Sequence, residues 1–277
     1  MNLPPRPSRS LAGKVAIVTG AGSSPTGLGN GRAISILLAE DQCSVVCVDL
    51  SLESAQTTVE MCLGEGKGGR AVAVQADVTK EDDCRRIVET AMSRLGRVDI
   101  LINNVGILGP GGSAVDVERE EWARGLDVNV TSMVLMSKHT IPKMLLNTPT
   151  SPSELSIRGS IVNMASVAGL LGGTPSLLYP VSKGAVVQLT RAMASHHGKD
   201  GIRVNTVCPG MVYTPMVSDG GMSEETRQRR RERSLLQTEG SAWDAAGAVR
   251  YLAGGEARWV TGTVLTVDAG ATCTTKF

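Results

Sequence analysis

The sequence predicts an α/β fold in which helices cover both faces of a doubly wound, seven-stranded parallel sheet. Short apolar runs rich in β-branched residues alternate with segments of helical periodicity along most of the chain. The expected strands are apolar at nearly every position, as parallel strands buried on both faces are. A glycine-rich segment also separates the first strand from the first helix, which is an arrangement that binds phosphate groups.

The composition is that of an ordinary globular protein, with 277 residues of which 42% are hydrophobic and 20% are charged. A chain of this length forms one large or two small domains. Because no linker or repeat divides it, we expect a disordered leader over residues 1–10 and a single domain over 11–277. The 28 basic and 27 acidic side chains leave a net charge of +1, so no overall field attracts nucleic acid or an anionic membrane.

The six cysteines include no CxxC pair and no His/Cys cluster at the spacing of metal ligands. We therefore expect reduced, mostly structural thiols, no bound metal and a cytoplasmic protein. Residues 1–10 lack the apolar core of a signal peptide, and no run approaches the roughly 18 apolar residues of a membrane span.

The first strand, loop and helix predict a phosphate site. The strand KVAIV (14–18) precedes the loop TGAGSSPTGLGNG and the helical pattern RAISILLAE. Backbone N–H groups and the helix dipole attract phosphate at a helix N-terminus, and glycines let the ligand approach the backbone. The residues expected there are Gly20, Gly29, Asn30 and Gly31.

The second strand, SVVCVDL (44–50), carries Asp49 and Leu50 at its end, and Asp49 follows Gly31 by eighteen residues. A carboxylate in this place accepts hydrogen bonds from an adenosine ribose and repels a 2′-phosphate, which favours NAD over NADP. The alternative is that Asp49 only caps the following helix, LSLESAQTTVEM.

The alternation of strands and helices continues, with helices expected over 52–63 and 81–95 and strands over 71–78 and 98–106. The ligand crevice of such a sheet lies at the carboxyl ends of its strands. The residues that fall at these ends are Asp77, Val78, Asn103, Asn104 and Gly106.

A long helix expected from about residue 118 to 146 contains an unusual asparagine. Asn129 lies in its middle, where asparagine is neither a good helix former nor a good core residue. It is a hydrogen-bonded buried amide, a ligand for a water molecule, or the cause of a local helix distortion. The polar, proline-containing residues 147–158 are expected to form a surface excursion before the strand GSIVNMAS.

The segment from Ser166 to Lys183 predicts acid–base chemistry. Tyr179 and Lys183 are four residues apart, so a helix from about Tyr179 places both on one face. A neighbouring cation favours the phenolate and lowers the pKa of a tyrosine from its usual value near 10. Ser166 can hold a substrate oxygen within reach of that phenol. Such Tyr–Lys pairs also occur by chance on solvated helices, so the pair alone does not establish a site.

The C-terminal part supplies two more strands, IRVNTV and TVLTVDAG, and a helix near 242–253. Five arginines lie between Arg227 and Arg233. This run is either a solvated helix face or part of a mobile lid whose arginines meet an anionic substrate or a partner subunit. The loop CPGMVYTPM follows the first of these strands and contributes Pro209, Gly210, Val212 and Thr214.

In their order, these motifs resemble those of the short-chain dehydrogenase/reductase family in its single-domain form, with a Rossmann fold. The motifs are TGAG…GLGNGRA, NNVG, DVNV, Ser166 with YPVSK, PGMVYT and VTGTVLTVDAG, over roughly residues 11–270. The resemblance implies an oxidoreductase that transfers hydride between NAD(H) and a secondary alcohol or ketone.

The resemblance also implies residue roles. Tyr179 is expected to be the catalytic acid/base, and Lys183 to lower its pKa and hold the nicotinamide ribose. Ser166 is expected to orient the substrate, and Asn129 to anchor a water that relays protons from Lys183 to solvent. The cofactor contacts implied are the glycine loop for the pyrophosphate, Asp77 and Val78 for the adenine, Asn104 and Gly106 for the cleft, and Val212 and Thr214 for the carboxamide.

Three departures from the family pattern stand out. The glycine loop is about five residues longer than the usual TGxxxGxG, with the insertion around SSPTGL. We align GNGRA with the start of the helix. The usual NNAG is NNVG, and a proline follows Tyr179, where the first turn of a helix tolerates it.

Two other functions remain open, an NADPH-dependent ketoreductase of secondary metabolism and a non-catalytic nucleotide-binding protein. The substrate pocket is expected from segments 107–115, 167–176 and a lid over about 215–240. These are rich in Gly, Leu and Met, which suggests a mainly apolar, medium-sized alcohol or ketone. By analogy with the family, a homotetramer is expected, assembled through helices around 118–146 and 179–199.

Overall fold

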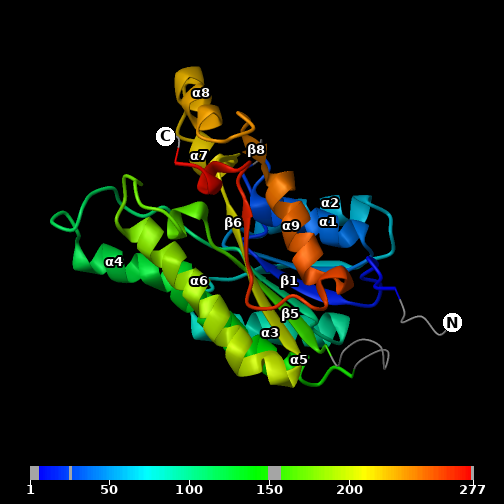
Figure 1. The fold of residues 1–277 in the computed structure, drawn as a ribbon. Coiled ribbons are helices and arrows are strands. Elements are labelled where there is room, and N and C mark those ends of the chain that lie inside the picture. Colours follow the sequence, from blue (N-terminus) through cyan, green and yellow to red (C-terminus); the bar gives the residue numbers. More distant parts are fainter. Residues whose placement is uncertain (1–5, 25–26, 149–156, 276–277) are drawn as a thin grey trace.

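The computed structural model describes residues 6–24, 27–148 and 157–275, which contain the expected seven-stranded parallel sheet (Figure 1). The strand order is β3-β2-β1-β4-β5-β6-β9. The direction of winding reverses between β1 and β4, which opens a crevice beyond the carboxyl ends of these strands. The strands are β1 (Val15–Thr19), β2 (Ser44–Asp49), β3 (Ala71–Gln75), β4 (Ile100–Asn103), β5 (Gly159–Met164), β6 (Ile202–Pro209) and β9 (Val264–Val267).

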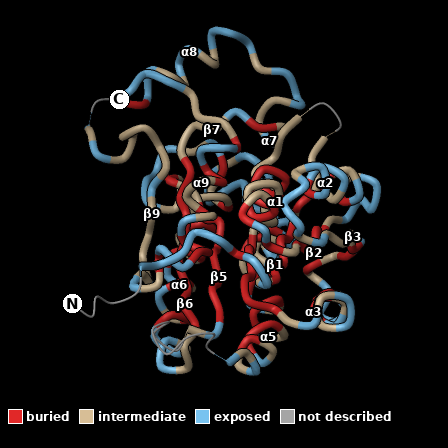
Figure 2. The backbone as a smooth tube through the Cα atoms, turned by 90° about the vertical axis from the view of Figure 1, so that its right-hand side faces the viewer, coloured by how far each residue is buried: buried red, intermediate tan, exposed pale blue. Residues whose placement is uncertain are grey.

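Helices cover both faces of the sheet, because successive side chains of a strand point to opposite faces. On β1, Ala16 and Val18 belong to one apolar cluster and Ile17 to the other. In Figure 2 the buried strands β1, β5 and β6 form the centre of the molecule. The first cluster includes residues of α1 (Asn30–Glu40), α2 (Leu52–Gly64) and α9 (Ala242–Ala253), and the second includes residues of α3 (Glu81–Leu95), α5 (Ser132–Met144) and α6 (Leu178–His197).

The helix expected over 118–146 is interrupted. It consists of α4 (Arg119–Leu126), a π-helical turn η1 (Asp127–Thr131) and then α5. The π turn contains Asn129, so the interpretation of this residue as part of a local helix distortion is confirmed.

The lid contains more structure than its polar sequence predicted. Two helices, α7 (Pro215–Ser218) and α8 (Glu224–Glu232), lie beyond the carboxyl edge of the sheet (Figure 1). The two-residue strands β7 (Val212–Tyr213) and β8 (Gly240–Ser241) pair in parallel at its base, and strands this short leave no periodicity in the sequence. The backbone N–H of Leu235 donates to the carbonyl oxygen of Ala269 at 3.0 Å, which attaches the end of the lid to the segment after β9.

Other expectations are tested only in part. Residues 1–5 of the expected leader and 149–156 of the expected excursion lie outside the described residues. Arg9, within the leader, pairs with Asp41 at 3.2 Å. The cysteines are unpaired and all but Cys273 are buried. Across the described ranges, no helix is long and apolar enough to cross a membrane, and no group of His, Cys, Asp or Glu can hold a metal ion.

Candidate active site

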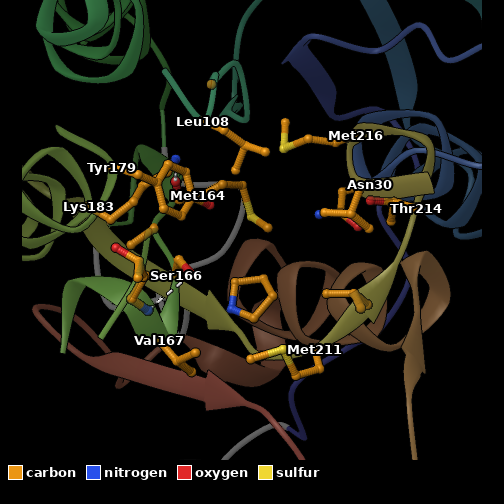
Figure 3. A pocket seen from close by; sticks show the side chains of 18 of the residues that line it. Asn30, Leu108, Met164, Ser166, Val167, Tyr179, Lys183, Met211, Thr214 and Met216 are labelled. Carbon is orange, nitrogen blue, oxygen red and sulfur yellow. Dashed lines mark hydrogen bonds between the residues drawn. The ribbon is translucent and has the colours of Figure 1, made fainter. Parts of the chain in front are cut away.

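One cavity of about 610 Å³ lies above the carboxyl edge of the sheet and contains the predicted catalytic side chains (Figure 3). Ser166 follows β5, while Tyr179 and Lys183 project from the first turns of α6. The Ser176 hydroxyl accepts a hydrogen bond from the backbone N–H of Tyr179 at 3.3 Å, which satisfies a donor that the helix start leaves free. The fold thus brings Ser166, Tyr179 and Lys183 together from two segments, the turn after β5 and the start of α6.

The phenol of Tyr179 is hydrogen-bonded to Ser166, as expected of a pair that handles one substrate oxygen. Its pKa, however, is raised above 10, because burial disfavours the phenolate more than the Ser166 hydrogen bond favours it. Lys183 is not among the groups that shift this pKa, so its expected effect on Tyr179 stays a prediction. The Lys183 ammonium lies 5.7 Å from the ring centroid of Tyr179, and burial lowers the pKa of the lysine itself to about 8.

Lys183 is fixed by the strand beneath it. Its Nζ donates a 2.9 Å hydrogen bond to the carbonyl oxygen of Met164 at the end of β5. A methyl group on Gly106 would lie 3.0 Å from this Nζ, so the glycine of NNVG leaves room for the lysine. This contact explains why a glycine occupies position 106, for which the sequence had indicated only that it lies at the end of a strand.

Asn129 is a hydrogen-bonded buried amide. Its Oδ1 accepts from the backbone N–H of Ile107 at 2.7 Å, and its Nδ2 donates to the Ile107 carbonyl and to the Ser182 hydroxyl, both at 2.9 Å. The side chain thereby joins η1 to the segment after β4 and to α6. Its proposed role in a water relay stays a prediction.

The glycine loop packs closely against the first helix. A Cβ on Gly31 would lie 2.0 Å from the carbonyl oxygen of Gly20, so no larger residue fits without movement. Gly20 itself has a φ of +62°, in the left-handed region that favours glycine. Asn104 binds the same turn, because its Nδ2 donates to the carbonyl oxygens of Thr19 and Gly20 at 3.1 and 3.0 Å.

The lengthened part of the loop is organised by Arg32, which the sequence analysis did not single out. Its guanidinium is buried and donates to the carbonyl oxygens of Ser23, Ser24 and Gly27 at 3.2 to 3.4 Å. Its Nε donates to the Thr58 hydroxyl of α2 at 3.0 Å. An arginine in the first helical turn directly after an insertion was the signal available in the sequence.

Asp49 does not cap α2. The cap is Ser51, whose side chain accepts from the backbone N–H of Ser54. The two carboxylate oxygens of Asp49 accept from the backbone N–H groups of Ser51 at 3.0 Å and of Gly22 at 2.9 Å, which places the charge beside the glycine loop. The carboxylate is partly exposed there, at the end of β2.

The cavity wall includes thirteen of the eighteen predicted positions. The other five do not line it: Asp49, Leu50, Asp77, Val78 and Asn129. Met164, Met211 and Ala271 line it but were not predicted, since nothing in an isolated methionine or alanine marks a pocket. The predicted positions in the wall are Gly20, Gly29, Asn30, Gly31, Asn104, Gly106, Ser166, Tyr179, Lys183, Pro209, Gly210, Val212 and Thr214.

These residues fit a nicotinamide dinucleotide. The close approach of Gly31 to Gly20 leaves no room for a Cβ at Gly31, and both glycines line the same cavity as Tyr179. The Oδ1 atom of Asn30 is buried without a hydrogen-bond partner, beside Thr214 in Figure 3. Polar atoms left unpaired in a cavity wall are expected where a polar ligand supplies the missing partner.

Comparisons with known proteins find related sequences and structures over most of the chain. A family model described as enoyl-(acyl carrier protein) reductase matches residues 26–272. Meso-2,3-butanediol dehydrogenase of Serratia marcescens is 34% identical over 259 residues, 94% of each chain. A Burkholderia xenovorans crystal structure described as a short-chain dehydrogenase/reductase is 37% identical, with a TM-score of 0.87 over 95% of this chain and 98% of that one.

A third relative was solved with ligands. It is a 7α-hydroxysteroid dehydrogenase in complex with NADH and 7-oxo glycochenodeoxycholic acid, 32% identical with a TM-score of 0.84 over 95% of each chain. Fold and site together define a nicotinamide-dependent oxidoreductase. The chain belongs to the short-chain dehydrogenase/reductase family.

Proposed function

We propose that this protein is an NAD-preferring dehydrogenase that oxidises a secondary alcohol to a ketone, with Tyr179 as the acid/base. The observation that carries the proposal is the meeting of Ser166, Tyr179 and Lys183 with the glycine loop in a single cavity. Two of the relatives described above are named for alcohols of this kind, a butanediol and a hydroxysteroid.

The chain's own residues supply proton transfer and position. When bound, the nicotinamide takes up or gives back the hydride. Tyr179 removes the hydroxyl proton of the alcohol, and Ser166 holds that oxygen by a hydrogen bond. Tyr179 acts as the phenolate and becomes the neutral phenol when it takes the proton. Lys183 stabilises the phenolate before this transfer, because a cation near the ring favours the charged form. Oxidation of one alcohol thus leaves one ketone, one reduced cofactor and one proton, which departs through Tyr179.

The preference for NAD rests on two side chains. The Asp49 carboxylate lies beside the glycine loop, where it repels a 2′-phosphate. Arg32 is the cation that the loop itself provides, and its Nε, Nη1 and Nη2 atoms all donate to protein oxygens. It therefore offers no free donor to a 2′-phosphate. The alternative is an NADPH-dependent ketoreductase, which a preference for NADPH of more than about tenfold in kcat/KM would establish.

Three further parts of the proposal concern the whole protein. We propose that residues 11–277 fold as one domain, that the protein resides in the cytoplasm, and that it assembles as a homotetramer through α4, α5 and α6. A monomeric mass in solution would refute the tetramer.

The substrate is mainly apolar, because Leu108, Met164, Met211 and Met216 line the cavity that contains Tyr179.

The absorbance of reduced nicotinamide during turnover tests the activity. NAD and NADP are supplied in parallel with a panel of secondary alcohols, with wild type beside Tyr179→Phe. We expect turnover with NAD and a loss of about 10²- to 10⁴-fold in the variant, the contribution usual for a general acid or base. Equal rates for both proteins would exclude Tyr179 as the acid/base. Binding of NAD without turnover of any alcohol would favour the non-catalytic alternative.

A further inference from the structure

The arginine run of the lid divides into paired residues and one exception. Arg227 and Arg230 both contact Glu239, at 3.1 and 2.6 Å. Arg229 lies 3.8 Å from Glu225, and Arg231 lies 2.7 Å from Glu224. For Arg233, the fifth arginine, the described part of the chain offers no ion pair and no hydrogen bond.

The paired arginines account for the architecture of the lid. The Glu239 carboxylate is 4% exposed and is held between two guanidinium groups. Arg230 also donates to the carbonyl oxygen of Val212 in β7 at 2.9 Å, and Arg227 lies 4.1 Å from the ring centroid of Tyr213. These contacts fasten α8 to the β7–β8 pair, so their charges are already compensated within the protein.

Arg233 lines the catalytic cavity. The cations in the described wall are Lys183, Arg230 and Arg233, and no aspartate or glutamate is among the described lining residues. Lys183 belongs to the catalytic group and Arg230 is neutralised by Glu239. Arg233, an exposed residue, is thus the remaining cation of this wall, and no described carboxylate pairs with it.

The segment that carries Arg233 is fixed in place. Ser234, the next residue, is buried, and its hydroxyl donates to the carbonyl oxygen of Thr238 at 3.0 Å. Leu235 and Leu236 donate from their backbone N–H groups to Ala269 at 3.0 and 3.3 Å. Arg233 also ends α8, where any cation gains from the helix dipole. Arg229, Arg230 and Arg231 in the last turn serve that purpose equally, so the dipole does not explain why Arg233 faces the cavity.

Arg233 and Tyr179 lie on different parts of the cavity wall. Arg233 ends α8, which Figure 1 shows apart from α6, the helix that carries Tyr179. The apolar residues Met211, Met216 and Val217 line the same cavity. A ligand that uses both parts has a secondary hydroxyl at one end, an apolar body, and an anionic group at the other.

We propose that Arg233 is a specificity residue that binds the carboxylate of a hydroxy-acid substrate, at the end remote from the reacting hydroxyl. The proposal rests on the dehydrogenase activity proposed above and adds the chemical class of its substrate. Arginine suits this task, because its planar guanidinium forms two parallel hydrogen bonds to a carboxylate.

The test uses a series of substrates in which only charge and length vary. The probes are saturated hydroxy acids of about five to ten carbons, with the secondary hydroxyl next to the terminal methyl group, each compared with its primary amide, which has the same shape without the charge. The proposal predicts that kcat/KM of the wild type favours acid over amide by about tenfold at one optimal length. An equal kcat/KM for acid and amide at every length would overturn it.

Variants of Arg233 and Arg229 test which arginine produces the preference for acid over amide. Arg233→Ala should lower kcat/KM for the best acid about tenfold and leave its amide within twofold, while Arg233→Lys should retain part of the preference. Arg229→Ala is the matched control, since it removes the same charge from the same helix but lies outside the cavity wall. The KM for NAD should stay unchanged in Arg233→Ala. A rise in that KM with the acid preference intact would assign Arg233 to the cofactor and refute the proposal.

A binding measurement separates failure of this inference from failure of the proposed activity. Calorimetric titration of the protein with NAD present, a cofactor form that cannot reduce a ketone, compares the keto acid of the best length with its amide. If no alcohol is oxidised but Arg233→Ala weakens keto-acid binding about tenfold, the anion site stands and the dehydrogenase function fails. Equal affinity for keto acid and keto amide in the wild type refutes the anion site whatever the activity.

Discussion

Lys183 donates a 2.9 Å hydrogen bond from Nζ to the carbonyl oxygen of Met164, the last residue of β5. This bond ties the first turns of α6 to the strand that delivers Ser166. The lysine is 4% exposed, and burial lowers its pKa to about 8 from the ordinary 10.5. Between these two values the unfolded chain holds a proton at this position that the folded protein has released.

This pKa difference makes stability depend on pH in a known direction. Stability rises with pH wherever the unfolded state binds more protons, so the Lys183 penalty decreases from pH 8 upward. We expect the free energy of unfolding of the wild type, minus that of Lys183→Met, to rise by about 2 kcal/mol between pH 8 and 10. Denaturant titrations of both proteins at several pH values measure the difference, and a flat profile would show that the folded-state pKa is not lowered.

The sheet was predictable because its signals are local. β1 and β2 are short runs of buried apolar residues bounded by turn residues, and the predicted α3 agrees with the structure from Glu81 to Leu95. The meeting of Tyr179 and Lys183 in one cavity was predictable, because residues four apart lie on one face of a helix. The apolar strand runs and the Tyr–Lys spacing can both be recognised without knowledge of the tertiary structure.

What was missed depends on contacts distant in sequence. For Asn129 the sequence left several roles open, because its partners Ile107 and Ser182 are linked to it by no local pattern. The raised pKa of Tyr179 follows from burial, which the Tyr–Lys spacing does not reveal. Arg32 acts through loop carbonyl oxygens whose positions follow from the insertion and not from the family pattern.

Two glycines give opposite predictions for the same substitution. A Cβ at Gly31 would overlap the carbonyl oxygen of Gly20 at 2.0 Å, so Gly31→Ala must displace the first helix from the loop. We expect loss of NAD binding and a marked loss of stability. Gly247, inside α9, has open space around its Cβ position, so Gly247→Ala should raise the free energy of unfolding by about 0.5 to 1 kcal/mol. Thermal unfolding with and without NAD compares the two, and normal NAD affinity in Gly31→Ala would contradict the close packing.

Arg32 should be required for the lengthened glycine loop. Arg32→Ala leaves the carbonyl oxygens of Ser23, Ser24 and Gly27 without their donor, and unpaired buried acceptors cost about 1 to 3 kcal/mol each when water cannot replace the partner. We expect a loss of stability of a few kcal/mol and a rise of about tenfold or more in the KM for NAD. Arg85→Ala, which removes an exposed arginine of α3, is the control and should change neither. An unaltered KM in a folded Arg32→Ala protein would show that the loop keeps its shape unaided.

Asp49 should decide between the two nicotinamide cofactors. Asp49→Asn removes the charge but keeps an oxygen that can accept the hydrogen bond from the Gly22 N–H, now 2.9 Å long. If the carboxylate acts by repelling a 2′-phosphate, the ratio of kcat/KM with NADP to that with NAD should rise about tenfold or more, mainly through a lower KM for NADP. Ser51→Ala is the control, because it removes the cap of α2 at the same strand end without altering charge. An unchanged cofactor ratio in Asp49→Asn, with the loss confined to stability, would mean that Asp49 serves the loop through Gly22 and does not select the cofactor.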